Sequence, residues 1–141
     1  MSTKQLDGRE LVGQNWLYDG PHSSDTVMEA ARAIDELVTY LGNATGPGNG
    51  KTTLKFGPTV YRVLGALSGT LAGLDQVLEQ LCDAETRIGN TAKAYDDRRD
   101  RPAAATTCEV VQLVRFARKH LESVHSHIAL AHSAASHIGH D

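Results

Sequence analysis

The C-terminal segment of the sequence constrains the fold most, because it carries one unbroken apolar repeat. Steps of four and three alternate along residues 107–138 at Val110, Val114, Ala117, Leu121, Val124, Ile128, Ala131, Ala135 and Ile138. This spacing is typical of a helix that packs a narrow stripe against a partner helix, as in a coiled coil. Thr106 and Glu109 have the spacing of a capping box in front of the repeat. The sequence therefore predicts a helix over residues 107–138.

A second repeat with the same period predicts a helix over residues 58–96. Pro58 suits a first helical turn. The repeat consists of Val60, Leu64, Leu67, Leu71, Leu74, Leu78 and Leu81. Beyond these leucines the repeat weakens, so the helix either ends near Gly89 or continues to residue 96, and we expect it to continue. The charged turn over residues 97–106 is short, so the two long helices must lie antiparallel.

A shorter helix is predicted upstream, over residues 25–42. Its apolar face consists of Val27, Ala31, Ile34, Val38 and Leu41. Residues 1–24 form an N-terminal arm with a weak helical signal, and residues 43–57 form a loop with too many glycines for a regular element.

These elements predict an all-α fold, an elongated antiparallel helical bundle in a single domain, 1–141. It has three main helices, two of them long, with an N-terminal arm or short helix. Because the first helix is about half as long as the others, we expect it to cover residues 60–78 and 120–138. Gly65, Gly69 and Gly73 would let its backbone approach closely. The other half of the hairpin then needs the arm or another chain to cover it.

The composition is that of an ordinary globular protein. Hydrophobic residues make up 40% and charged residues 22% of the chain, and a net charge of -3 creates no field that attracts nucleic acid or an anionic membrane. The sequence shows neither a signal peptide nor a run of about eighteen apolar residues. We therefore expect a cytoplasmic protein without a membrane span.

The two cysteines, Cys82 and Cys108, lack the spacing of a metal site, which fits a reducing compartment. If the second helix continues to residue 96, they are offset by about 12 Å along the hairpin and cannot bond. If it ends at Gly89, they lie level. We expect no disulfide.

Residues 46–52, Gly-Pro-Gly-Asn-Gly-Lys-Thr, look at first like a phosphate-binding loop. That motif needs a glycine where Thr45 stands and a strand before the loop, whereas a helix is predicted to end at Gly42. We interpret the segment as a helix connector and expect no cofactor.

Glu122 and His125 have the spacing of the motif that di-iron helical bundles use. Such sites need two of these motifs and further carboxylates, and this sequence has one. Both residues fall beside the predicted apolar repeat rather than in it. A metal site would need a second chain to complete it, so we do not favour one.

Four histidines border the repeat of the last helix, His120 and His127 on one flank and His125 and His132 on the other. Imidazoles in such positions are usually edge packing, half covered and half solvated. The alternative is an interface that becomes charged between about pH 5 and pH 7.

Arg98, Arg99 and Arg101 form the most basic stretch, but three aspartates interleave with them. We interpret the stretch as a solvated turn, with contact to nucleic acid as the alternative. No Cys/His or Ser/His/Asp arrangement presents an activated nucleophile. We therefore expect no enzyme activity.

Four strings occur in the order Gly46-Pro-Gly-Asn-Gly, Val60-Tyr-Arg-Val-Leu-Gly, Gly73-Leu-Asp-Gln and Tyr95-Asp-Asp-Arg-Arg. In this order they resemble small helical proteins of actinobacteria that are associated with mobile genetic elements. The resemblance covers most of the chain and implies no activity. It implies a setting beside DNA-processing proteins of a plasmid or other mobile element.

The sequence therefore predicts a non-enzymatic helical interaction or scaffold module whose partner is another protein or a second copy of the chain. One alternative is a metal-binding helical bundle completed across a dimer by Glu122 and His125. The other is an accessory nucleic-acid-binding protein of a mobile element, although we do not expect nucleic-acid binding by this chain alone. The interaction candidates are His120, His125, His127, His132, Arg98, Arg99 and Arg101.

Overall fold

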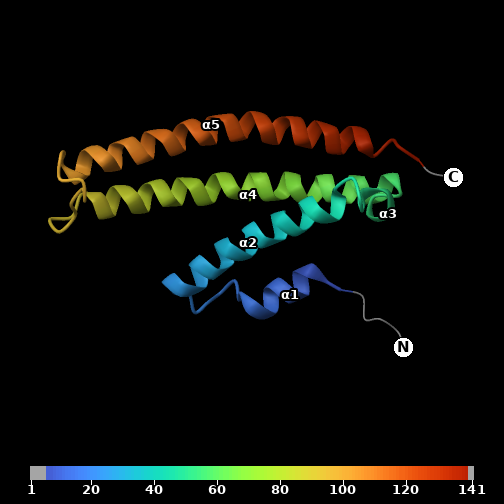
Figure 1. The fold of residues 1–141 in the computed structure, drawn as a ribbon, viewed down its shortest axis with the longest axis horizontal. Helices are drawn as coiled ribbons and strands as arrows, with labels where there is room; N and C mark the ends of the chain where they lie inside the picture. The colour runs from blue at the N-terminus through green and yellow to red at the C-terminus, as the bar shows by residue number, and fades with distance from the viewer. Residues whose placement is uncertain (1–5, 140–141) are drawn as a thin grey trace. The chain divides into compact units, whose positions relative to one another are not determined.

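The computed structural model describes residues 6–139 (Figure 1). Every regular element in that range is a helix, which confirms the all-α fold class. The helices are α1 (Gly8–Asn15), α2 (Ser24–Thr45), α3 (Gly50–Thr53), α4 (Gly57–Gly89) and α5 (Ala103–Ala135). Where the sequence predicted one domain, the chain divides into two compact units, residues 1–53 and residues 54–141. The predicted packing of the first helix on the hairpin remains a prediction.

In the first unit, the N-terminal arm contains the short helix α1. The Asp7 side chain caps it by accepting hydrogen bonds from the backbone N–H groups of Arg9 and Glu10. After α1 ends, the Trp16 indole N–H donates to the carbonyl of Thr26 over 3.2 Å, which ties the arm to the first turn of α2. Ser23 and Thr26 form a reciprocal capping box at the start of α2.

The glycine-rich segment after α2 is more regular than predicted. Helix α2 continues to Thr45, and α3 forms within the expected loop of residues 43–57. The Thr53 hydroxyl donates to the carbonyl of Ala44 over 2.6 Å and folds α3 back on the end of α2. At Gly50 a Cβ would lie 2.6 Å from the carbonyl oxygen of Thr45, so glycine permits this close turn. Gly50 thus serves close approach of the backbone rather than an irregular loop.

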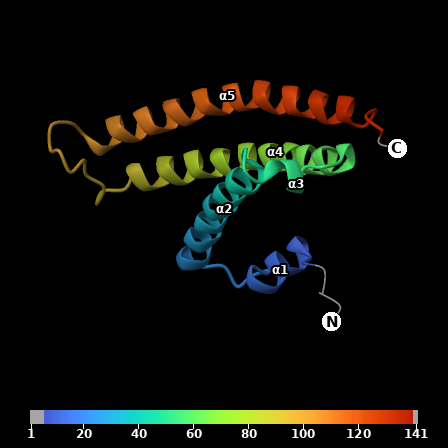
Figure 2. The ribbon, with the colours of Figure 1, turned by 45° about the vertical axis from the view of Figure 1, so that its right-hand side comes forward.

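The second unit is an antiparallel hairpin of α4 and α5, which lie side by side in both views (Figures 1 and 2). The contacts between the two helices run in opposite directions along the sequence, because higher residue numbers on α4 pair with lower residue numbers on α5. Tyr61 contacts His132, Asp75 contacts Arg118 and Glu85 contacts Thr107. Each helix has 33 residues and is therefore about 50 Å long. The predicted antiparallel arrangement of the two long helices is confirmed.

The predicted continuation of the second helix to residue 96 is wrong, because α4 ends at Gly89. A Cβ at Gly89 would lie 1.8 Å from the Thr107 hydroxyl oxygen, so α5 approaches the end of α4 closely. The connection over residues 90–102, which we call the hairpin tip, is correspondingly longer than predicted. Helix α5 begins at Ala103 rather than residue 107, and it ends at Ala135 rather than residue 138.

The predicted capping box before the last helix is also wrong. Pro102 precedes α5, and no side chain caps its first turn. Thr106 lies inside the helix and donates its hydroxyl to Asp96, while Glu109 pairs with Arg101. The two residues stabilise the hairpin tip rather than the helix end.

The row of α5 residues that faces α4, which we call the seam, differs from the predicted repeat. It retains four predicted members, Val114, Leu121, Ile128 and Ala135. Thr107 is a further member of the seam. The remaining members each come directly after a residue of the predicted repeat: they are Val111, Arg118, His125 and His132. The corresponding row on α4 is Tyr61, Leu64, Ser68, Leu71, Asp75, Leu78, Cys82, Glu85 and Gly89. Polar or small side chains thus alternate with aliphatic ones along the middle of the interface.

Both cysteines are free, although the end of α4 at Gly89 brings them to similar heights along the hairpin. Cys82 is buried in the seam, with its sulfur 4.0 Å from the carbonyl oxygen of Val111. Cys108 is exposed, one residue after the seam residue Thr107.

Candidate interaction surface

The shift of the seam leaves an apolar row beside it on each helix. The rows consist of Val60, Leu67, Leu74, Leu81 and Ile88 on α4, and of Val110, Ala117, Val124, Ala131 and Ile138 on and just beyond α5; we call them the apolar side. All ten residues are exposed. Each of these residues comes directly before a seam position, except Ile138, which comes directly before the position that would follow if the seam continued. The apolar side therefore runs the length of the hairpin.

Both rows fall on the same side of the hairpin because the two helices run in opposite directions. The residues that follow the seam show the same geometry on the other side. Ala72, Arg115 and Glu122 each come one residue after a seam position, and all three line a single groove. By the same symmetry, the residues that precede the seam on α4 and α5 share the remaining side.

The hairpin has a small core. Among the described residues, only Cys82 and Val111 are hydrophobic and buried, and no side chain is completely buried. The leucines of the predicted repeat are partly outside: Leu81, for example, is 53% exposed. A chain of this size ordinarily encloses a substantial core, whereas the apolar residues described here are largely exposed.

The groove on the other side of the hairpin is polar and has a volume of about 560 Å³. Arg118 donates two hydrogen bonds to the Asp75 carboxylate, over 2.9 and 3.1 Å, and lies 3.6 Å from a Glu79 oxygen. The hydrogen bonds from Arg118 lower the pKa of Asp75 below its usual value. This paired arrangement joins the helices across the middle of the hairpin.

Glu122 and His125, the predicted weak metal candidates, both line this polar groove. Glu122 is exposed, whereas His125 is half-buried in the seam rather than on the flank. Within residues 6–139, no group of three or more histidine, cysteine or acidic side chains is placed to hold a metal ion. The structure brings the pair together without a third ligand.

The other predicted histidines separate into two environments. His132 is half-buried in the seam and stacks on the Tyr61 ring, with 4.2 Å between the ring centroids. The assignment of His125 and His132 to a flank is therefore wrong. His120 and His127 are exposed, and the His127 Nδ1 lies 2.7 Å from the carbonyl oxygen of Ser123.

The His132 ring also requires a glycine opposite it. A Cβ at Gly65 would lie 2.8 Å from the His132 Nε2 atom. Of the three glycines predicted to admit the first helix, Gly65 therefore makes room for α5. Gly69 and Gly73 have no atom within 4 Å of such a Cβ.

At the hairpin tip, two of the three candidate arginines are engaged by carboxylates. The buried Asp96 accepts hydrogen bonds from Arg98, over 3.1 and 2.8 Å, and from Arg101 over 3.4 Å. The bonds from Arg98 and from the Thr106 hydroxyl hold the pKa of Asp96 far below its usual range. Arg101 also pairs with Glu109.

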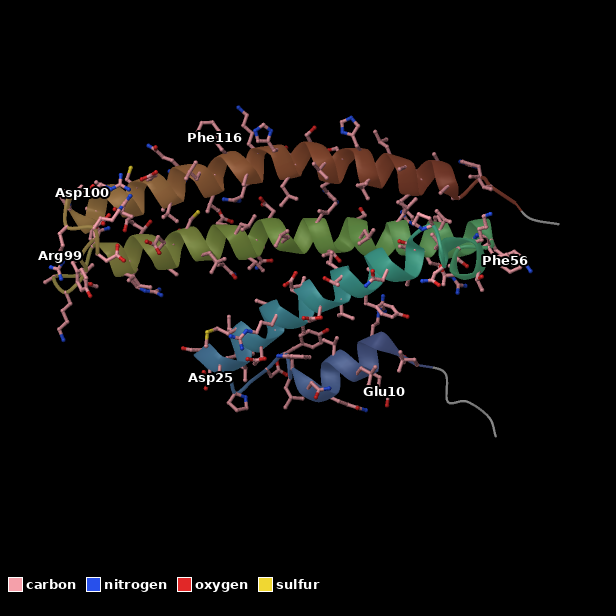
Figure 3. All side chains as sticks on the ribbon, in the orientation of Figure 1. Glu10, Asp25, Phe56, Arg99, Asp100 and Phe116 are labelled. Carbon is pink, nitrogen blue, oxygen red and sulfur yellow. The ribbon has the colours of Figure 1, made fainter. Side chains whose placement is uncertain are left out.

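The third arginine, Arg99, lies at the outer end of the tip (Figure 3), with its guanidinium 4.2 Å from the centre of the Tyr95 ring. Its φ of 59° places it in the left-handed region that few side chains adopt. The tip is thus an internally paired turn, and its basic groups are largely compensated.

Sequence reasoning missed the residues that fix the hairpin, notably Asp75, Arg118 and Asp96. A usable signal existed for the first two, because each follows a predicted repeat position by one residue and they carry opposite charges. No signal identified Asp96 among the three aspartates of the turn, since only the fold of the tip buries one of them.

The first unit has an apolar pocket of its own, with a volume of about 390 Å³. Val12, Trp16 and Ala30 are among its lining residues, so α1 folds back beside the first turns of α2. The predicted apolar face of α2 is exposed; Ile34 and Val38, for example, lie outside any core.

Among the described helices, none is long and apolar enough to cross a membrane. No protein-family model, curated protein or solved structure matches the chain. The resemblance to proteins of mobile genetic elements therefore stays a prediction.

Proposed function

We propose that this protein is a non-enzymatic helical interaction module, and that the apolar side of the α4–α5 hairpin is its binding surface. The observation that carries the proposal is the contrast between that exposed apolar side and a core in which Cys82 and Val111 are the only buried hydrophobic residues described. A partner helix laid along the apolar side would supply the missing core.

Burial of the apolar side against a partner would favour binding. Complete burial of one leucine, isoleucine or valine side chain contributes about 1.5–3 kcal/mol. Leu67, Leu74 and Val124 are 37%, 38% and 48% exposed, so each retains between about a third and a half of that contribution. Such residues recur at every heptad, and the apolar surface of the partner adds its own contribution toward an association cost of about 4–15 kcal/mol.

The charged residues of the hairpin support a structural rather than a catalytic role. Asp75 and Arg118 satisfy each other, as do Asp96 and its arginines. Groups that serve as acid, base or nucleophile need a reacting atom within reach, and these side chains face one another instead.

The experiment is affinity capture of the full chain from its own host, with matched variants. Leu74→Glu places a charge on the apolar side, and Leu130→Glu places the same charge on the outer face of α5, where the native leucine is 69% exposed. We expect a specific partner to be retained by the unmodified chain and by Leu130→Glu, and lost with Leu74→Glu. A partner retained equally by all three would contradict the proposal.

A second candidate function, a metal-binding bundle completed across a dimer, is favoured by one observation: Glu122 and His125 line the same groove. Elemental analysis of the purified chain tests it. Bound metal that disappears in both Glu122→Gln and His125→Ala would support the candidate, and metal-free protein after incubation with Zn²⁺ or Fe²⁺ would remove it.

A further inference from the structure

A second hollow adjoins the polar groove of the hairpin, and two cationic side chains belong to both. Arg115 and Lys119 are one helical turn apart on α5 and line the groove between α4 and α5. They also line a hollow of about 500 Å³, together with Gln112 and Phe116. All four residues of this hollow come from α5, so a single helix fixes their spacing.

The two shared cations differ from the third cation of the groove in having no carboxylate partner. Arg118 donates two hydrogen bonds to the Asp75 carboxylate. Within residues 6–139, no hydrogen bond or ion pair engages the side chain of Arg115 or Lys119. Glu122 is the remaining carboxylate of the groove, so one free negative charge opposes two free positive ones. The unpaired charge of the groove is therefore positive, although the whole chain carries a net charge of -3.

An exposed aromatic ring stands beside these cations. Phe116 lies on the side of α5 that faces away from α4 (Figure 3) and is 64% exposed. It lines the second hollow with Arg115 and Lys119. Guanidinium and ammonium groups bind phosphate oxygens, and an exposed aromatic face stacks on the planar ring of a ligand. The combination fits a ligand that carries both a phosphate and a planar ring.

We propose that α5 binds a free mononucleotide, with its phosphate between Arg115 and Lys119 and its base on the Phe116 ring. A terminal phosphate carries close to two negative charges and three acceptor oxygens. It therefore matches two cations better than a carboxylate or a phosphodiester, each of which carries a single charge. The groove lies on the other side of the hairpin from the apolar side, so this proposal is independent of the proposed partner binding.

The test is isothermal titration of the purified full chain with AMP and with two probes that each lack one part of it. Adenosine has no phosphate, and ribose 5-phosphate has no base. We expect AMP to bind at least about tenfold more tightly than either probe, because only AMP engages the cations and the ring together. A Kd for AMP weaker than about 1 mM, or equal affinities for AMP and ribose 5-phosphate, would overturn the proposal.

Substitutions locate the site. Arg115→Gln and Lys119→Gln should each weaken AMP binding about tenfold, since each removes a charged donor to the phosphate. Phe116→Leu should weaken AMP binding at least about fivefold and leave the binding of ribose 5-phosphate unchanged. Glu122→Gln should strengthen AMP binding roughly threefold by removing the opposing charge, a gain that a misfolded variant cannot produce.

The matched control is Arg87→Gln, which removes an exposed cation of α4 that lines neither hollow. It should leave the Kd for AMP unchanged. Equal weakening by Arg87→Gln and Arg115→Gln would show attraction by overall charge alone and would overturn the site. Loss of AMP binding would leave the partner capture that depends on Leu74 unaffected, so the two proposals fail separately.

Discussion

Gly89 allows α5 to pack closely on the end of α4, because Thr107 occupies the space that a side chain at residue 89 would need. A Cβ there would lie 1.8 Å from the Thr107 hydroxyl oxygen. Both residues belong to the seam. Glycine at this position therefore serves the tertiary packing of α5 on α4.

The first prediction follows from this contact. Gly89→Ala should lower the free energy of unfolding by about 1–3 kcal/mol, the usual cost of overpacking. Gly69→Ala, the matched control in open space, should raise it by about 0.5–1 kcal/mol, because alanine favours the helix. Urea unfolding of both variants measures the difference, and a Gly89→Ala protein as stable as the parent would contradict the close packing.

The second prediction concerns pH and Asp96. Its pKa is lower in the folded protein than in the unfolded chain, so the ionised carboxylate stabilises the fold above an unfolded pKa of about 3.9. That stabilisation is lost as the pH falls from this value through the lower folded pKa. Asp96→Asn should therefore be less stable than the parent at pH 7, with a difference that narrows below about pH 3.9. Thermal unfolding against pH, with Asp97→Asn as the exposed neighbouring control, measures this; a difference that does not vary with pH would contradict it.

At the scale of elements, the α4–α5 interface depends on charge pairing as well as apolar packing. Asp75 and Arg118 lie in the seam at the middle of both helices, and Arg118 donates two hydrogen bonds to the Asp75 carboxylate. Above and below them the seam alternates between aliphatic residues such as Leu71 and Leu78 and small or polar ones. The pair favours one relative height of the two helices, because sliding would break both hydrogen bonds between Arg118 and Asp75.

The third prediction tests this pairing by exchanging the charges. Asp75→Arg or Arg118→Asp alone should destabilise the hairpin, since each places like charges opposite one another. The double variant Asp75→Arg/Arg118→Asp should recover part of the loss, measured as a non-additive urea midpoint. Additive losses in the double variant would show that the two side chains do not interact.

The three main helices followed from the sequence, apart from their ends, but the way the two long helices face each other did not. Each long helix carries two adjacent rows of residues, the predicted repeat and the observed seam. The two rows share Leu64, Leu71 and Leu78 on α4, and Val114, Leu121 and Ile128 on α5. Hydrophobicity alone selects the row with more leucines. The structure selects the row with Cys82, Gly89 and the Asp75–Arg118 pair, because small groups allow close approach and the charges pair across the interface. These are properties of two helices together, which the periodicity of one helix does not report.

At the scale of the whole molecule, the chain forms two units, each with an apolar face that remains exposed. In the first unit this face lies on α2, and in the second it is the apolar side of the hairpin. The proposed function follows from the seam that buries Val111 and leaves Leu67, Leu81 and Val110 outside. A different seam would bury the apolar side within the hairpin and remove the basis for the proposal.

The most direct test of the seam is a nuclear Overhauser measurement of side-chain contacts within one chain, on methyl- and ring-labelled protein. The structure predicts contacts between the Tyr61 and His132 rings, whose centroids are 4.2 Å apart. Direct methyl contacts within one chain between Leu67 and Val124 and between Leu81 and Val110, without the Tyr61–His132 contact, would contradict the account.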